Sequence, residues 1–151
     1  MKIAIALFPG FTALDAIGPY EVLHNLPDAD LDFVAEAAGP VACDTGKVVL
    51  NVARSFADVP DPDIILIPGG GGTRGLVANG GALVEWIRAV HPGTLFTTSV
   101  CTGSLVLGTA GVLQGLEATT HWAVLDSLAK FGAVPVSRRV VAARRGSGCG
   151  A

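Results

Sequence analysis

Short apolar runs alternate with segments of helical periodicity along most of this chain, and this alternation limits the folds it can adopt. The runs expected to form buried strands are 2–7, 31–36, 63–67 and 94–100. The segments expected to form helices are 14–26, 80–90, 102–110 and 120–132. Because strands that alternate with helices form a parallel sheet covered on both faces, the sequence predicts an α/β sandwich.

Several local signals refine this prediction. The apolar positions expected to form one buried face of helix 14–26 are Leu14, Ile17, Val22, Leu23 and Leu26. Gly18-Pro19 should kink or restart that helix, because proline lacks an amide proton and clashes with the preceding turn. Trp86 should lie on the apolar face of helix 80–90, and Gly132 should end helix 120–132. Residues 39–52 are expected to form a hairpin, and one or two last short strands should follow residue 132.

Length and charge favour one acidic domain with a different C-terminal end. The 151 residues carry a net charge of −3, and half of them are apolar. All 13 acidic residues precede position 138, so the body argues against a nucleic-acid or anionic-membrane surface. We therefore expect a domain over residues 1–139 and an irregular basic tail over residues 140–151. No segment is long and apolar enough to span a bilayer, and no signal-peptide pattern opens the chain.

The three cysteines, Cys43, Cys101 and Cys149, show neither a disulfide framework nor zinc-ligand spacing. This pattern predicts a reducing cytoplasm as the compartment and no metal site. Cys43 and Cys149 are not framed by a strand and a helix, and we expect no chemistry from them.

Three features are expected to meet at one edge of the sheet. Asp15 follows the first strand, the glycine-rich loop 69–72 follows the strand at 63–67, and Cys101 follows the strand at 94–100. Ligands of open α/β sheets bind beyond the carboxyl ends of the strands, so this edge is the predicted site.

Cys101 lies where a strand is expected to turn into a helix. Unpaired amides at a helix start favour a thiolate, which is the reactive form of cysteine. The amides after Cys101, together with those of Gly69 and Gly70, are candidates to hold developing negative charge. The alternative is that Cys101 is simply a small, buried core residue.

Asp15 is the candidate partner of the thiol. Two acids in contact share protons, so ionisation of the thiol first would leave a protonated Asp15 beside a nucleophile, as general acid catalysis requires. The alternative is that Asp15 caps the helix that follows it. His121 is a weaker candidate, because a histidine that opens a helix is more often a cap or a packing residue.

The segments LDAIGPYEVL (14–23), IPGGGG (67–72) and TTSVCTGSLVLGTAGVLQGLEATTHW (97–122) resemble the ThiJ/PfpI superfamily, which is related to class I glutamine amidotransferase domains. Within it, the cysteine–threonine pair at 101–102, the ATTHW segment and Asp15 are most similar to the isonitrile hydratases. The resemblance implies a flavodoxin-like three-layer sandwich, a nucleophile elbow at Cys101, Asp15 as acid partner and Thr102 in the site.

The resemblance also implies hydration of a small-molecule isonitrile to an N-substituted formamide by a homodimer, through a Cys101 thioimidate and without a metal or organic cofactor. Members of the superfamily continue past about Arg139 with further core elements, so the C-terminal end is expected to be shortened. Two alternatives to an enzyme stay open. One is a regulator domain, because the same signature resembles the amino-terminal domain of AraC-type transcriptional regulators. The other is a cysteine redox sensor.

Overall fold

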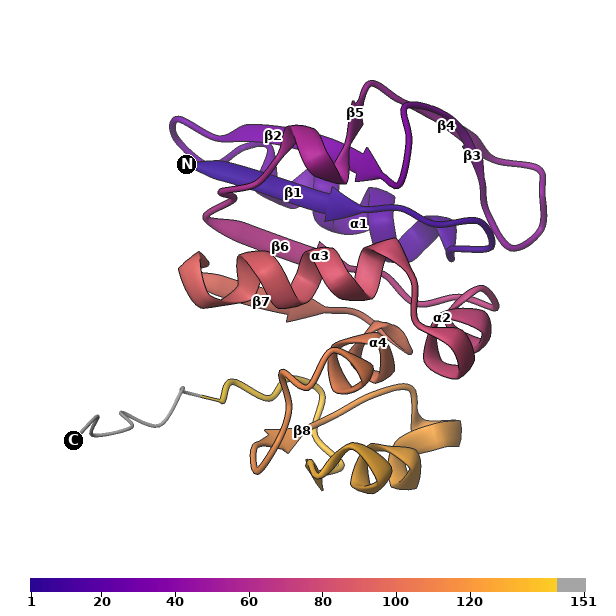
Figure 1. The fold of residues 1–151 in the computed structure, drawn as a ribbon, viewed down its shortest axis with the longest axis vertical. Coiled ribbons are helices and arrows are strands. Elements are labelled where there is room, and N and C mark those ends of the chain that lie inside the picture. The colour runs from indigo at the N-terminus through magenta and orange to yellow at the C-terminus, as the bar shows by residue number, and fades with distance from the viewer. Residues whose placement is uncertain (144–151) are drawn as a thin grey trace.

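The computed structural model describes residues 1–143, and its core is a five-stranded parallel sheet (Figure 1). Its strands, in spatial order, are β5 (Arg54–Ser55), β2 (Asp30–Ala35), β1 (Lys2–Ala6), β6 (Ile64–Ile67) and β7 (Phe96–Ser99). The apolar run at β6 is buried at every position, as expected for a central parallel strand. The carboxyl ends of β1, β6 and β7 all point to the same edge of the sheet.

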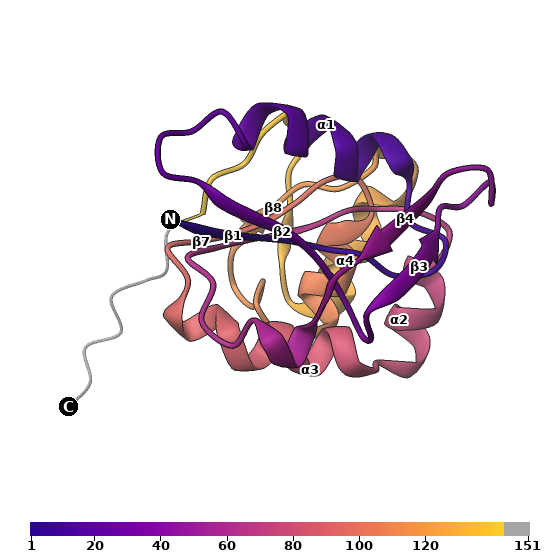
Figure 2. The ribbon, with the colours of Figure 1, turned by 90° about the horizontal axis from the view of Figure 1, so that it is seen from above.

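Helices cover both faces of this sheet (Figure 2). Helix α1 (Ala13–Leu23) lies on one face, and α3 (Ala82–Val90) and α4 (Gly103–Thr109) lie on the other. The remaining elements are α2 (Thr73–Asn79), the hairpin of β3 (Gly39–Ala42) and β4 (Val49–Val52), the 3₁₀ helices η1 (Phe56–Asp58), η2 (His91–Gly93) and η3 (Trp122–Phe131), and the short strands β8 (Glu117–Ala118) and β9 (Val134–Pro135). The predicted three-layer α/β sandwich is confirmed.

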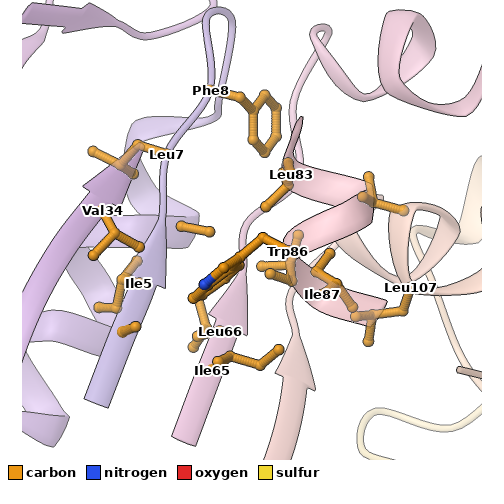
Figure 3. Close-up of a cluster of buried hydrophobic side chains, with 14 of the residues drawn as sticks. Ile5, Leu7, Phe8, Val34, Ile65, Leu66, Leu83, Trp86, Ile87 and Leu107 are labelled. Atoms are coloured by element: carbon orange, nitrogen blue, oxygen red, sulfur yellow. The ribbon is translucent and has the colours of Figure 1, made fainter. Parts of the chain in front are cut away.

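The main core lies between the sheet and α3 (Figure 3). Leu83, Trp86 and Ile87 are all buried there, which confirms the predicted apolar face of this helix. The Trp86 indole stacks on Phe56, with ring centroids 5.0 Å apart, and its Nε1 donates to the Val59 carbonyl at 3.0 Å. This packing fixes α3 against the sheet and satisfies the one polar atom of the indole.

Helix α1 differs from its prediction. It continues through Pro19 without a restart, and it ends at Leu23 rather than at residue 26. Its expected core face is wrong at three positions, because Leu14 and Val22 are 76% and 70% exposed and Leu26 is also exposed. The physical reason is that α1 covers only part of its face of the sheet, and nothing within residues 1–143 packs on its outer side.

The strand at 94–100 and the helix at 120–132 also differ from expectation. Strand β7 is the edge of the sheet, and Phe96 is 62% exposed because the α1 layer does not reach over it. Segment 122–131 is a 3₁₀ helix interrupted by non-helical backbone at Val124, although Gly132 ends it in the left-handed conformation as predicted. Helix α2 was not predicted, since it directly follows four glycines.

No helix within residues 1–143 has the length and apolar character needed to cross a membrane. The basic tail predicted for 140–151, including Cys149, lies outside the described residues from position 144 onward.

Candidate active site

The chain turns sharply at Cys101, between β7 and α4. The Val100 amide still donates to the Ile67 carbonyl at 3.0 Å, so the ladder with β6 runs to the residue before the cysteine. Cys101 then adopts a φ of 54°, a left-handed conformation that is rare for any residue with a side chain. Gly103 makes this turn possible, because a Cβ there would collide with the Ile67 carbonyl oxygen. Strained backbone between a strand and a helix is the geometry of a nucleophile elbow.

Asp15 reaches the same place from the first turn of α1. Its side chain is buried, and its Oδ2 accepts a hydrogen bond from the Gly69 amide at 3.1 Å. A Cβ placed on Gly69 would lie 2.7 Å from the Cys101 Cβ and 2.9 Å from the Asp15 Oδ2. The aspartate and the cysteine therefore lie close together, next to Gly69. The capping alternative does not hold, because Thr12 is the N-cap of α1.

The glycine-rich loop 69–72 packs directly on this pair. The Gly70 amide donates to the Thr102 Oγ1 at 3.1 Å, and the Gly69 carbonyl accepts from the Thr12 amide at 2.8 Å. Gly70 has a φ of 133°, and a Cβ on it would lie 2.6 Å from the Thr12 nitrogen, so only glycine fits. The amides of Gly69 and Gly70 are thus bonded to the side chains of the site, and their role in holding charge on a substrate stays a prediction.

The environment of the sulfur opposes its ionisation. Burial raises the pKa of the Cys101 thiol, a hydrogen bond from the Thr102 amide lowers it, and the nearby charge of Asp15 raises it again. The Thr102 hydroxyl makes a further hydrogen bond that lowers this pKa. The amide at the helix start therefore acts in the expected direction, but burial outweighs it and the pKa of the thiol is raised. The arrangement favours a thiol whose proton has a carboxylate beside it.

His121 takes the less reactive of its two predicted roles. Its Nδ1 accepts a hydrogen bond from the Ala123 amide at 3.2 Å, so it caps η3, and its ring packs at 5.3 Å from that of Trp122. The neighbouring Thr120 donates from Oγ1 to the Cys101 carbonyl at 3.0 Å, which ties this segment to the elbow. Any part for His121 in substrate binding stays a prediction.

Two threonines of the site were not found from the sequence. Thr120 holds the elbow carbonyl, and the buried Thr73 donates from Oγ1 to the Thr102 Oγ1 at 3.1 Å. The signal for Thr73 was its place directly after the glycine-rich loop, at the start of a helix that was not predicted. Cys43 is buried in the loop between β3 and β4, where it forms a β-bridge with Phe11 of the β1–α1 turn and does not itself lie between a strand and a helix. Within residues 1–143, no group of three or more His, Cys, Asp or Glu side chains is placed to hold a metal ion.

Together, the parallel sandwich and its elbow define an α/β protein with a cysteine at a strained strand-to-helix turn, at the carboxyl edge of the sheet. A family model described as the DJ-1/PfpI family matches residues 1–145. The chain belongs to this family, which confirms the resemblance seen in the sequence.

Individual relatives agree with this assignment. The chain is 45% identical over 141 residues to an isonitrile hydratase of Pseudomonas putida, and 31% identical over 126 residues to the HTH-type transcriptional regulator CdhR of Pseudomonas aeruginosa. A solved ThiJ/PfpI family protein from Pseudomonas syringae superposes with a TM-score of 0.88 at 35% identity. The match to the hydratase takes in 93% of this chain and 61% of the hydratase. The match to CdhR takes in 80% of this chain and 37% of the regulator, and the match to the solved protein takes in 93% of this chain and 58% of that protein. The chain therefore spans only part of the length of each of these proteins.

Proposed function

We propose that this chain catalyses the hydration of isonitriles to N-substituted formamides, with Cys101 as the nucleophile and Asp15 as its proton partner. The observation that carries the proposal is that the Asp15 carboxylate and the Cys101 side chain lie together next to Gly69. The similarity to the Pseudomonas putida isonitrile hydratase supports the choice of substrate class.

The first step adds the Cys101 thiol across the terminal carbon of the isonitrile. Because the thiol keeps its proton at neutral pH, the adjacent Asp15 carboxylate accepts that proton as the sulfur attacks. The sulfur–carbon bond forms, and Asp15 delivers the same proton to that carbon. The product is a thioimidate, R–N=CH–S, attached to Cys101, and Asp15 is again a carboxylate.

The second step consumes one water molecule. Asp15 removes a proton from the water as its oxygen adds to the thioimidate carbon, and Asp15 passes that proton to the nitrogen. The carbon–sulfur bond then breaks, the remaining hydroxyl proton passes to the sulfur through Asp15, and the N-substituted formamide leaves. One isonitrile and one water give one formamide, so no oxidant, reductant or cofactor enters the balance. Thr102 contributes hydrogen bonds to the sulfur in its anionic form.

The proposal includes a homodimer in a reducing compartment such as the cytoplasm. The exposed side chains of Leu14 and Val22 on α1 and of Phe96 on β7 support a second copy of the chain as their cover. The free thiols of Cys43 and Cys101 are consistent with such a compartment.

The experiment is incubation with n-butyl isonitrile, with N-butylformamide followed by mass spectrometry. Wild type is expected to form the formamide, whereas Cys101→Ala and Asp15→Asn are expected to lose turnover. Cys43→Ala removes a thiol outside the site and is the matched control, which should retain activity. Equal formamide production by all four proteins would contradict the mechanism, and its absence from all four would contradict the function.

A regulatory role is the second candidate, because the chain is also similar to the transcriptional regulator CdhR. In that case the site would bind a small molecule without turning it over. Retention of an unchanged isonitrile by the protein, with no formamide formed, would favour this alternative. Rapid oxidation of Cys101 by dilute peroxide, again without turnover, would favour a redox sensor.

A further inference from the structure

The carbonyl of Cys101 is held by two hydroxyl groups from different parts of the chain. Thr120, which follows β8, donates from its Oγ1 to this carbonyl oxygen at 3.0 Å. Ser104, in the first turn of α4, donates from its Oγ to the same oxygen at 3.3 Å, and its side chain is buried. A carbonyl oxygen has two lone pairs and each hydroxyl has one proton, so both bonds form together. We name these two donors the carbonyl clamp.

The carbonyl clamp acts on a residue whose backbone needs support. Cys101 has a φ of 54°, and a residue with a side chain keeps this left-handed conformation only where its surroundings hold it. On the strand side, the preceding Val100 amide is fixed on the Ile67 carbonyl. The carbonyl clamp holds the other side of the turn, because it bonds the peptide group that joins Cys101 to Thr102.

The direction of this carbonyl also sets the direction of the amide that follows it. The peptide between Cys101 and Thr102 is trans, so its C=O and N–H point in opposite directions. The Thr102 nitrogen lies 2.7 Å from the position that a Cβ on Gly69 would take, and the Asp15 Oδ2 lies 2.9 Å from that same position. The carbonyl end of the peptide group is therefore bonded to α4 and Thr120, while its amide end lies beside the carboxylate of the site.

We propose that the two residues of the carbonyl clamp are positioning residues, which hold the Cys101 carbonyl and thereby aim the Thr102 N–H into the site. An N–H fixed in this direction stabilises negative charge as it develops on the sulfur or on an atom bonded to it. A hydrogen bond from this amide lowers the pKa of the Cys101 thiol, which is consistent with such a direction. The inference rests on the proposed function only in taking Cys101 as the nucleophile.

Isotope labelling gives a direct view of this one peptide group. The pair Cys101–Thr102 is the one place in the sequence where a threonine follows a cysteine. Protein labelled with ¹³C at the cysteine carbonyl and with ¹⁵N at threonine therefore gives a single peak in an HNCO spectrum. The ¹³C frequency of that peak reports hydrogen bonding to the Cys101 carbonyl, and its other two frequencies report the surroundings of the Thr102 N–H.

The first measurement is the position of this peak in variants of the carbonyl clamp. Thr120→Val removes the hydroxyl, keeps the branched shape and should move the ¹³C frequency upfield, because a carbonyl that loses a hydrogen bond is less polarised. Thr120→Ser keeps the donor and should leave the peak at its wild-type position. Ser104→Ala removes the donor on α4 and should move the peak in the same direction, so the test does not depend on the folding of one variant.

The second measurement is the rate at which iodoacetamide alkylates Cys101 at neutral pH, read by mass spectrometry of the peptide that contains it. Thr120→Val and Ser104→Ala should each slow alkylation about threefold to tenfold, the effect expected for weakening one hydrogen bond to a charged group. Thr120→Ser should react at the wild-type rate. The matched control is Thr119→Val, because Thr119 is half-buried like its neighbour but it is Thr120 that bonds the carbonyl. The control should change neither measurement.

Three results would overturn the proposal. An unchanged ¹³C frequency in both Thr120→Val and Ser104→Ala would mean that the carbonyl clamp does not form in solution. A shifted ¹³C frequency with unchanged or faster alkylation would mean that the clamp does not aim the Thr102 N–H into the site. Equal slowing in Thr119→Val would reduce the effect to a general loosening of the segment. Neither measurement needs an isonitrile, so these results are independent of whether the protein hydrates one.

Discussion

Gly69 packs against both of the groups on which the proposed chemistry depends. A methyl group there would lie 2.7 Å from both the Cys101 Cβ and the Thr102 nitrogen. We expect Gly69→Ala to push Asp15 and Cys101 apart and to reduce kcat/KM for isonitrile hydration about a hundredfold or more, because a displacement of about 1 Å can have that effect. The measurement is formamide production at several substrate concentrations.

Gly71 provides the matched control for this change. It lies two residues further along the same loop, and a Cβ on it would have no atom within 4 Å. Gly71→Ala should therefore keep nearly all of the activity. If both variants lose activity equally, the loss reflects stiffening of the loop and not the space between the two side chains.

Asp15→Asn is expected to separate thiol reactivity from catalysis. The Asp15 charge raises the pKa of Cys101, so its removal should lower that pKa and increase the thiolate fraction at neutral pH. Alkylation of Cys101 by iodoacetamide should become faster, while formamide production should fall by about 10²–10⁴-fold because no group carries the proton. Slower alkylation than in wild type would contradict the sign of this coupling.

Individual site residues differed in how far the sequence could predict them. Cys101 and Asp15 were predicted to meet because Cys101 directly follows an apolar strand, Asp15 opens the helix after another, and parallel strands bring their ends together. Thr73 was not, because its role depends on a hydroxyl contact between two separate helix starts. The direction of the Cys101 pKa shift was missed for a related reason, since burial is set by the packing of distant segments.

Helix α3 carries much of the packing on its side of the sheet. Trp86 is buried, stacks on Phe56 and donates to the Val59 carbonyl. Trp86→Ala should lower the free energy of unfolding by about 3–5 kcal/mol, the usual cost of removing a large buried aromatic side chain. Chemical denaturation followed by circular dichroism measures this change.

Trp122 is the matched control, because it is the second tryptophan of the chain and is 83% exposed. Trp122→Ala should change the free energy of unfolding by no more than about 0.5 kcal/mol. If both variants lose similar amounts of unfolding free energy, Trp122 must be buried in solution by something outside residues 1–143.

The elements that the sequence predicted well are those with a strong local pattern. β1, β6 and α3 have apolar runs or a clear helical period, and each formed close to where it was expected. Helix α2 follows four glycines and has few apolar residues, so its formation depends on packing against α4. The exposure of β7 was missed because an apolar strand at the edge of a sheet has the same sequence pattern as a central one.

The molecule as a whole is covered unevenly. The layer that holds α3 and α4 buries its side of the sheet, whereas the other side is covered by α1 and, next to it, the extended end of the described chain (Figure 2). Beside α1 lies an apolar groove whose lining includes Pro19, Val22, Leu66 and Phe96. Leu14 lies two helical turns before Val22, on the same side of α1. Exposed apolar side chains gathered in this way are typical of an association surface.

If a second copy of the chain covers this groove, a charge placed in it should prevent association. We expect wild type to show twice the monomer mass by light scattering, and Val22→Glu to show the monomer mass, because burying an unpaired carboxylate at an interface is costly. Val49→Glu introduces the same charge at an exposed position of the β3–β4 hairpin and should leave the dimer intact. A dimer that survives Val22→Glu would place the interface elsewhere, and a wild type that is monomeric throughout would contradict the proposed homodimer.

Association on this face would also affect the site, because α1 carries Asp15 and a partner would hold this helix in place. A Val22→Glu monomer should therefore lose hydration activity, while its Cys101 should still react with iodoacetamide.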